Sequence, residues 1–156
     1  MKVELWLVGK TKDRWVAQGI DEYLKRCSRF TTVTTIIVAD SKYTQSEAIR
    51  QDETTRLTQQ LSRSHRAFTI LLDETGRQLT SPGFATLLQK QQDAGNQSFR
   101  FIIGGAYGVD EELRNSADEV LSLSQMTFPH QVVRIIFLEQ LYRAFTILRG
   151  EGYHHA

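Results

Sequence analysis

Apolar residues along this chain gather in five short runs, separated by longer stretches in which polar and apolar residues mix. The runs are rich in Val, Ile, Leu, Phe and Thr, and several are apolar without strict alternation. That pattern is typical of strands covered on both faces. We therefore predict strands at residues 3–9, 33–39, 67–73, 99–105 and 120–124.

The stretches between these runs have the length and spacing of helices. We predict helices at residues 13–29, 44–63, 81–94, 111–117 and 131–149. Ser81 is expected to cap the third helix with Pro82 at its first position, and Asp110 to cap the short fourth helix. Alternating strands and helices predict an α/β fold, with a mostly parallel sheet flanked by helices. No repeat or linker interrupts the pattern, so residues 1–156 are expected to form a single domain.

Composition favours an ordinary globular protein of a reducing compartment. The 156 residues are 40% hydrophobic and 24% charged, which excludes a disordered chain. The one cysteine, Cys27, cannot form an intrachain disulfide and is expected to be a half-buried helix residue. No run approaches the roughly 18 apolar residues of a membrane span, and the N-terminus lacks a signal-peptide cleavage pattern. We expect a cytoplasmic protein.

The net charge of only +1 does not by itself indicate a nucleic-acid-binding protein. Residues 1–30 carry seven Lys or Arg against four Asp or Glu, whereas residues 107–119 carry one Arg against five acids. A basic N-terminal face is able to meet phosphate, although a solvated face explains the excess equally well.

Glycines mark the strand ends as the place for ligand chemistry. "VGKT" at 8–11 ends like a phosphate-binding loop, but the required first glycine is Glu4 within a strand. "IIGGAYG" at 102–108 is a better candidate because glycine allows close backbone approach, although its spacing is not the dinucleotide fingerprint and a simple tight turn is the alternative. The loops after residues 72, 104 and 124 are expected to line one crevice. Its apolar and main-chain groups suit a flat heteroaromatic ring.

The last predicted helix is apolar around most of its circumference, too much for a single amphipathic face. It is either a central helix or half of a subunit interface, and we expect a homodimer. A monomer would leave several of these side chains exposed: Val133, Ile136, Phe137, Leu141, Phe145 and Leu148. Glu139 and Arg143 form an i,i+4 pair on the polar strip, with Arg134 earlier on it. They make either a surface ion pair or part of a site shared between subunits.

The tail "GEGYHHA" at 150–156 ends in Tyr153, His154 and His155. No carboxylate or cysteine spacing supports a metal site around these histidines, so we expect no metal. A Tyr–His pair on a tail is able to fold over a substrate as a hydrogen-bonding or proton-transfer group. On these residues alone we predict a frayed terminus.

Four stretches together resemble the RlmH family of the SPOUT methyltransferase superfamily, and the similarity covers essentially the whole chain. They are "MKVELWLVGKTKDRWVAQGIDEYLKR", "FIIGGAYG", "LSLSQMTFPHQVVRIIFLEQLYRAF" and "GEGYHHA". The resemblance implies a SPOUT-type knotted α/β fold with a C-terminal trefoil knot, and a homodimer packed through the last helix. It also implies methylation of a pseudouridine at N3 in 23S ribosomal RNA, in helix 69 of the assembled ribosome.

The resemblance further implies S-adenosyl-L-methionine as cofactor, held by the three strand-end loops. The implied cofactor-binding residues are Leu72, Gly104, Gly105, Leu123, Ser124, Gln125, Met126, Thr127 and Phe128. Because N3 carries a proton, catalysis needs a proton acceptor and a group that stabilises the resulting anion. The implied catalytic residues are Glu139, Arg143, Tyr153 and His154, with Arg143 as the cation and His154 or Glu139 accepting the proton.

His130 and Arg134 are alternatives that position the loop or the RNA. Two other functions stay open at this point. The chain would then be a tRNA methyltransferase of the same superfamily, or a non-catalytic ribosome assembly factor that binds an adenosine-type ligand.

Overall fold

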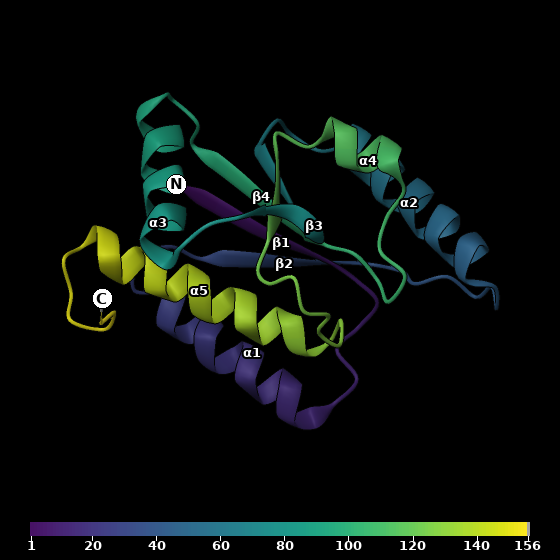
Figure 1. Cartoon of the computed structure of the whole chain (residues 1–156), viewed down its shortest axis with the longest axis horizontal. Helices are drawn as coiled ribbons and strands as arrows, with labels where there is room; N and C mark the ends of the chain where they lie inside the picture. Colours follow the sequence, from purple (N-terminus) through teal and green to yellow (C-terminus); the bar gives the residue numbers. More distant parts are fainter. Residues whose placement is uncertain (156) are drawn as a thin grey trace.

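The computed structural model describes residues 1–155, in which strands and helices alternate along the chain (Figure 1). The strands are β1 (Lys2–Val8), β2 (Val33–Val38), β3 (Phe68–Gln78), β4 (Ser98–Ile103) and β5 (Glu119–Ser122). The helices are α1 (Arg14–Cys27), α2 (Ser46–Ser62), α3 (Ser81–Asp93), α4 (Glu111–Ser116) and α5 (Val132–Leu148). Every predicted element is present in the predicted order.

The strands form one five-stranded sheet in the order β2-β1-β4-β3-β5, and all neighbouring pairs are parallel. Successive side chains of a strand point to opposite faces, and in β1 Leu5 and Leu7 join one buried cluster while Trp6 and Val8 join the other. Helices α1, α3 and α5 cover the first face, and α2 and α4 cover the second (Figure 1). The predicted parallel α/β sheet flanked by helices is confirmed.

Helix α5 is a central helix of the first layer rather than an exposed one. It packs against both α1 and α3, and Phe137, Leu141 and Phe145 are buried within this single chain. Gly19 allows α1 to approach closely, since a Cβ there would lie 2.8 Å from Ile135. The expectation that a monomer would expose these apolar residues was therefore wrong for those three. Val133, Ile136 and Leu148 are half-buried, so an apolar remainder still reaches the surface.

Two helix starts differ from their prediction. Thr80, not Ser81, caps α3, because its Oγ1 accepts a 3.0 Å hydrogen bond from the Gly83 amide. Ser81 is the first helical residue and Pro82 the second, one position later than predicted. Asp110 does precede α4, but its carboxylate accepts from Arg50 Nε at 2.7 Å instead of capping the helix.

Two other local predictions also need correction. β3 runs on to Gln78, beyond the predicted end at residue 73, because after an irregularity at residues 72–77 it pairs again with β5. Cys27 is completely buried, whereas we expected half-burial, and this burial raises the pKa of its thiol to about 12.

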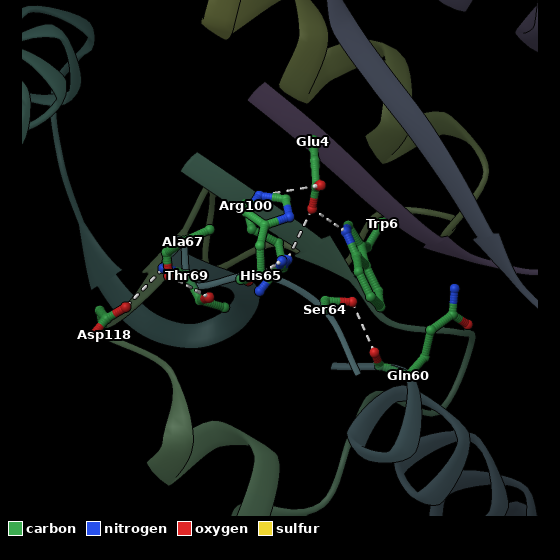
Figure 2. Close-up of polar contacts among 9 residues, drawn as sticks. All are labelled: Glu4, Trp6, Gln60, Ser64, His65, Ala67, Thr69, Arg100 and Asp118. Carbon is green, nitrogen blue, oxygen red and sulfur yellow. Dashed lines mark hydrogen bonds and ion pairs between the residues drawn. The ribbon is translucent and has the colours of Figure 1, made fainter. Parts of the chain in front are cut away.

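A largely buried ion pair joins the adjacent strands β1 and β4 on the face of α2. Glu4 and Arg100 lie opposite each other in β1 and β4, with Arg100 Nε 3.0 Å from the Glu4 carboxylate. Figure 2 shows Trp6, which donates to the same carboxylate at 2.8 Å, and His65, whose carbonyl accepts from Arg100 at 2.9 Å. These bonds satisfy charged groups that would otherwise be costly to bury.

Candidate cofactor and substrate site

A crevice of about 990 Å³ opens beyond the carboxyl ends of β3, β4 and β5. Ligands of open parallel sheets bind at this edge, and the volume is that of a typical small-molecule pocket. The three loops expected to share one crevice do meet here. The residues implied as cofactor ligands that line it are Leu72, Gly104, Gly105, Leu123, Ser124, Met126, Thr127 and Phe128. Gln125 is exposed and is not part of this lining.

The glycine-rich loop after β4 folds into a tight turn against α2. The Gly108 amide donates to the Gly105 carbonyl at 3.1 Å, and Gly108 has a φ of +73°, which favours glycine. A Cβ at Gly104 would lie 3.1 Å from Val109, and one at Gly105 would overlap the carboxylate of Glu53. The turn therefore needs glycine both for its backbone and for its close packing.

Glu53 is a residue that sequence reasoning missed. It is only 3% exposed, and its Oε2 accepts from the Ser41 amide at 3.0 Å. Its Oε1 has no hydrogen-bond partner among the described residues and faces Gly105. Burial raises the pKa of this carboxyl, with Asp40 and Asp52 adding to the effect. A buried carboxyl thus packs against the glycine-rich loop after β4.

Hydroxyl groups hold the loop after β5 in shape. Ser122 Oγ donates to the Ser124 carbonyl at 2.7 Å, and Ser124 Oγ accepts from the Met126 amide at 3.0 Å. Thr127 Oγ1 donates to Glu74 across the crevice mouth at 2.9 Å. The main chain of this loop is thus shaped by its own residues and tied to the loop after β3.

The start of α5 ties the crevice to the loop after β1. The Gln131 side chain accepts from the Lys12 amide at 2.9 Å and donates to the Lys10 carbonyl at 3.3 Å. Arg134 donates to the Val8 carbonyl at 2.8 Å and to Thr11 Oγ1 at 2.9 Å. Arg134 is fully buried, so placing it on a polar surface strip was wrong. Its observed contacts position the loop after β1.

His130 lines the crevice beside this junction. Burial lowers the pKa of its imidazole, and the nearby charges of Arg134 and Lys12 lower it further. Both effects favour the neutral ring, which has one nitrogen able to accept a proton.

The tail residues gather on the last turns of α5 into one polar cluster. Glu139 Oε1 accepts from Arg143 Nε at 3.0 Å and from the Tyr153 hydroxyl at 3.1 Å. Arg143 Nη1 lies 3.2 Å from His154 Nδ1, and its guanidinium lies 4.8 Å from the Tyr153 ring centroid. The tail is therefore docked on α5, not frayed.

The Tyr153 hydroxyl is strongly held in its neutral form. Burial, followed by hydrogen bonds with Tyr23 and Glu139, raises the pKa of Tyr153 to about 12. Tyr23 comes from α1 and was not among the predicted site residues. Its only sequence signal was its place on the apolar face of that helix.

The tail cluster and the crevice lie at different levels along α5 in this chain. Val133 lines the crevice, whereas Arg143 comes ten residues later, which is about 15 Å along a helix. The structure therefore assembles the implied cofactor residues and the implied catalytic residues as two separate groups.

Residues 1–155 contain neither a membrane-spanning helix nor a metal-binding cluster. No helix there is long and apolar enough to cross a membrane. No group of three or more His, Cys, Asp or Glu side chains within the same residues has the arrangement to hold a metal ion.

An α/β protein with a crevice at the carboxyl ends of parallel strands has the general form of a ligand-binding enzyme. The model of the family described as "Predicted SPOUT methyltransferase" matches residues 1–154. This chain belongs to the SPOUT methyltransferase family.

Curated relatives match the chain from end to end. One from Geobacter sulfurreducens is 47% identical over 155 residues, and one from Geotalea daltonii is 46% identical over 155 residues. Each alignment covers 99% of this chain and all of the relative, and both relatives are named "Ribosomal RNA large subunit methyltransferase H".

A solved structure shows the same fold in a more distant protein. It is "The structure of a probable methylase family protein from Haemophilus influenzae Rd KW20", with a TM-score of 0.55 and 10% identity. The match covers 99% of this chain and 70% of that chain.

Proposed function

We propose that this protein transfers a methyl group from S-adenosyl-L-methionine to a base of large-subunit ribosomal RNA. The observation that carries the proposal is the single crevice formed by the loops after β3, β4 and β5. Full-length similarity to relatives named as large-subunit ribosomal RNA methyltransferases supports the substrate class.

The crevice residues fit an adenosine-type methyl donor. Glycines 104 and 105 keep the loop after β4 free of side chains, and the loop after β5 offers main-chain groups with Leu123 and Phe128 beside them. Such a lining binds a flat ring by apolar contact and backbone hydrogen bonds. The set comprises Leu72, Gly104, Gly105 and residues 123–128, with Gln125 contributing its main chain.

The methyl donor supplies an already activated methyl group, so the protein mainly has to align the two reactants. We assign the acceptor as N3 of a pseudouridine, in helix 69 of 23S ribosomal RNA. The guanidinium of Arg143 stabilises the anion left after N3 loses its proton. Glu139 orients Arg143 and Tyr153 through the hydrogen bonds it accepts from both.

We assign proton acceptance to His154. Arg143 always donates, so the Nδ1 of His154 accepts in their 3.2 Å contact, and this nitrogen takes the N3 proton once its bond to Arg143 is released. A neutral imidazole is the side chain best suited to take a proton near pH 7.

We propose that the active site is completed in a homodimer. Within one protomer the crevice and the tail cluster are separated along α5. Neither group by itself therefore contains both the cofactor-binding and the catalytic residues. The second copy packs on α5, where Ile136 and Phe137 border a hollow of about 200 Å³ beside Leu79 and Phe84. In the same proposal the C-terminal part of the sheet region forms a trefoil knot, and the single-domain protein acts in the cytoplasm.

The test is methyl transfer from labelled S-adenosylmethionine to assembled ribosomes that lack the modification. Free ribosomal RNA and tRNA serve as comparison substrates. Incorporation at one pseudouridine of the large subunit is the expected result. Incorporation only into tRNA, or none on any substrate, overturns the proposal.

A further inference from the structure

Cations and aromatic rings lie just after the ends of β1 and β2, outside the lining of the crevice. Lys10, Lys12, Arg14 and Lys42 are exposed, and none of them makes an ion pair within residues 1–155. Trp15 and Tyr43 are 60% and 62% exposed. We call this set the basic rim: Lys10, Lys12, Arg14, Trp15, Lys42 and Tyr43.

The two segments of the basic rim lie side by side. Val8 and Val38 pair at the ends of β1 and β2, and the Gly9 amide donates to the Val38 carbonyl at 2.8 Å. A Cβ at Gly9 would lie 3.3 Å from Asp40, so the loops after both strands are in contact.

The basic rim also adjoins the crevice. Gln131 holds the main chain of both Lys10 and Lys12, so their side chains stay free while their backbones are fixed. The charge of Lys12 is near enough to His130, a crevice residue, to disfavour protonation of its ring. A polymer lying on the rim would therefore lie beside His130 of the crevice.

The opposite rim carries the opposite charge. Glu74 and Glu111 line the crevice there, together with Asp73 and Asp110, each already paired with an arginine. A polyanion is repelled from this side, which leaves the side of β1 and β2 for its approach.

We propose that the basic rim is the surface on which a strand of RNA lies as it enters the crevice. The lysines and Arg14 contact phosphates, and Trp15 and Tyr43 stack on unpaired bases beside the target. This inference rests on the proposed function in its choice of RNA. Lone exposed aromatic residues are ordinary, but two such rings flanked by four unpaired cations match the composition of a single-strand platform.

The test compares Lys10→Gln/Lys12→Gln with the control Lys2→Gln/Lys90→Gln, which removes two equally exposed charges away from the crevice. Binding of labelled large-subunit ribosomal RNA is measured by fluorescence anisotropy from low to high salt. S-adenosylmethionine affinity is measured separately by calorimetry.

Two lost phosphate contacts are expected to reduce the slope of log affinity against log salt by roughly 1.4 to 1.8. The control keeps the wild-type slope, and all variants keep the wild-type affinity for S-adenosylmethionine. Trp15→Ala weakens binding of single-stranded RNA at every salt concentration without changing the slope, because stacking is not ionic.

An unchanged slope in the rim variant, or an equal change in the control, overturns the inference. Wild-type protein that binds no RNA also overturns it. A loss of binding seen only with whole ribosomal particles overturns it too, because that result would indicate an acidic protein partner. These outcomes differ from failure of the proposed function, in which methyl transfer is absent although RNA binding responds to the rim variants.

Discussion

Arg134 in the last helix donates a 2.8 Å hydrogen bond to the carbonyl of Val8, 126 positions earlier in the chain. The guanidinium is fully buried, and Thr11 Oγ1 accepts its second bond at 2.9 Å. The end of the first strand and the wall of the crevice are thus fixed to each other by one side chain.

Replacing Arg134 with Met should lower the free energy of unfolding. The Val8 carbonyl would be left buried without its partner, which costs about 1–3 kcal/mol. Urea unfolding followed by circular dichroism measures the change. The control, Arg66→Met, removes an exposed arginine and should leave the midpoint unchanged. Equal midpoints for both variants would contradict the structural role of Arg134.

Glu53→Gln should make stability less dependent on pH. Burial raises the pKa of Glu53 above its ordinary value of 4.5, so the native state holds this proton more tightly than the unfolded state. Wild-type stability therefore falls as the pH rises from 4.5 through the raised folded-state pKa, because the buried carboxyl must ionise.

The glutamine variant should accordingly be more stable than wild type at pH 8 and nearly equal at pH 4. Denaturant unfolding at both pH values gives the comparison, with exposed Glu47→Gln from the same helix as the control. A wild-type curve parallel to that of Glu53→Gln would rule out a raised pKa.

Gly105→Ala should weaken binding of S-adenosylmethionine about tenfold or more. The new Cβ would overlap the Glu53 carboxylate, and overpacking of this kind costs about 1–3 kcal/mol. Calorimetric titration measures the loss, and Gly152→Ala, where a Cβ meets nothing within 4 Å, serves as control.

The double variant Gly105→Ala/Glu53→Ala makes room for the added methyl group and should recover part of the affinity. If the double variant binds S-adenosylmethionine more weakly than the two single losses together predict, the collision with Glu53 is not the cause of the weaker binding.

Tyr153→Phe should lower kcat while leaving the affinity for S-adenosylmethionine unchanged. The variant removes the hydroxyl that donates to Glu139 and so loosens Arg143, and misplaced catalytic groups cost up to about 100-fold. Single-turnover methyl transfer gives the rate, with exposed His155→Ala as the neighbouring control. A parallel loss of cofactor affinity would place Tyr153 in the cofactor site instead.

Apolar runs and the helix-length stretches between them predicted every strand and helix, because most of the core is built from regular apolar patterns. The same reasoning ended β3 too early, since its final residues are polar and become strand only by pairing with β5. That pairing of Gln78 with Ser122 is a tertiary contact that no local pattern contains.

The parts of the site that backbone and glycine form were predictable from the sequence. The parts that depend on buried charged residues were less predictable. Crevice loops follow from parallel topology, whereas Glu53 and Arg134 resemble the surface residues of ordinary helices. Their burial depends on which neighbours α2 and α5 meet, and α2 has too few apolar residues to reveal its inner face. The separation of the tail cluster from the crevice likewise depends on where α5, a helix of 17 residues, ends.

The bonds from Gln131 and Arg134 to the loop after β1 have a consequence for how the protein is made. They join positions separated by 119 to 126 residues, so the first loop cannot be fixed until the last helix has been synthesised. Contacts of such sequence separation form late and slow folding. During translation the loop after β1 therefore lacks these contacts until nearly the whole chain has emerged.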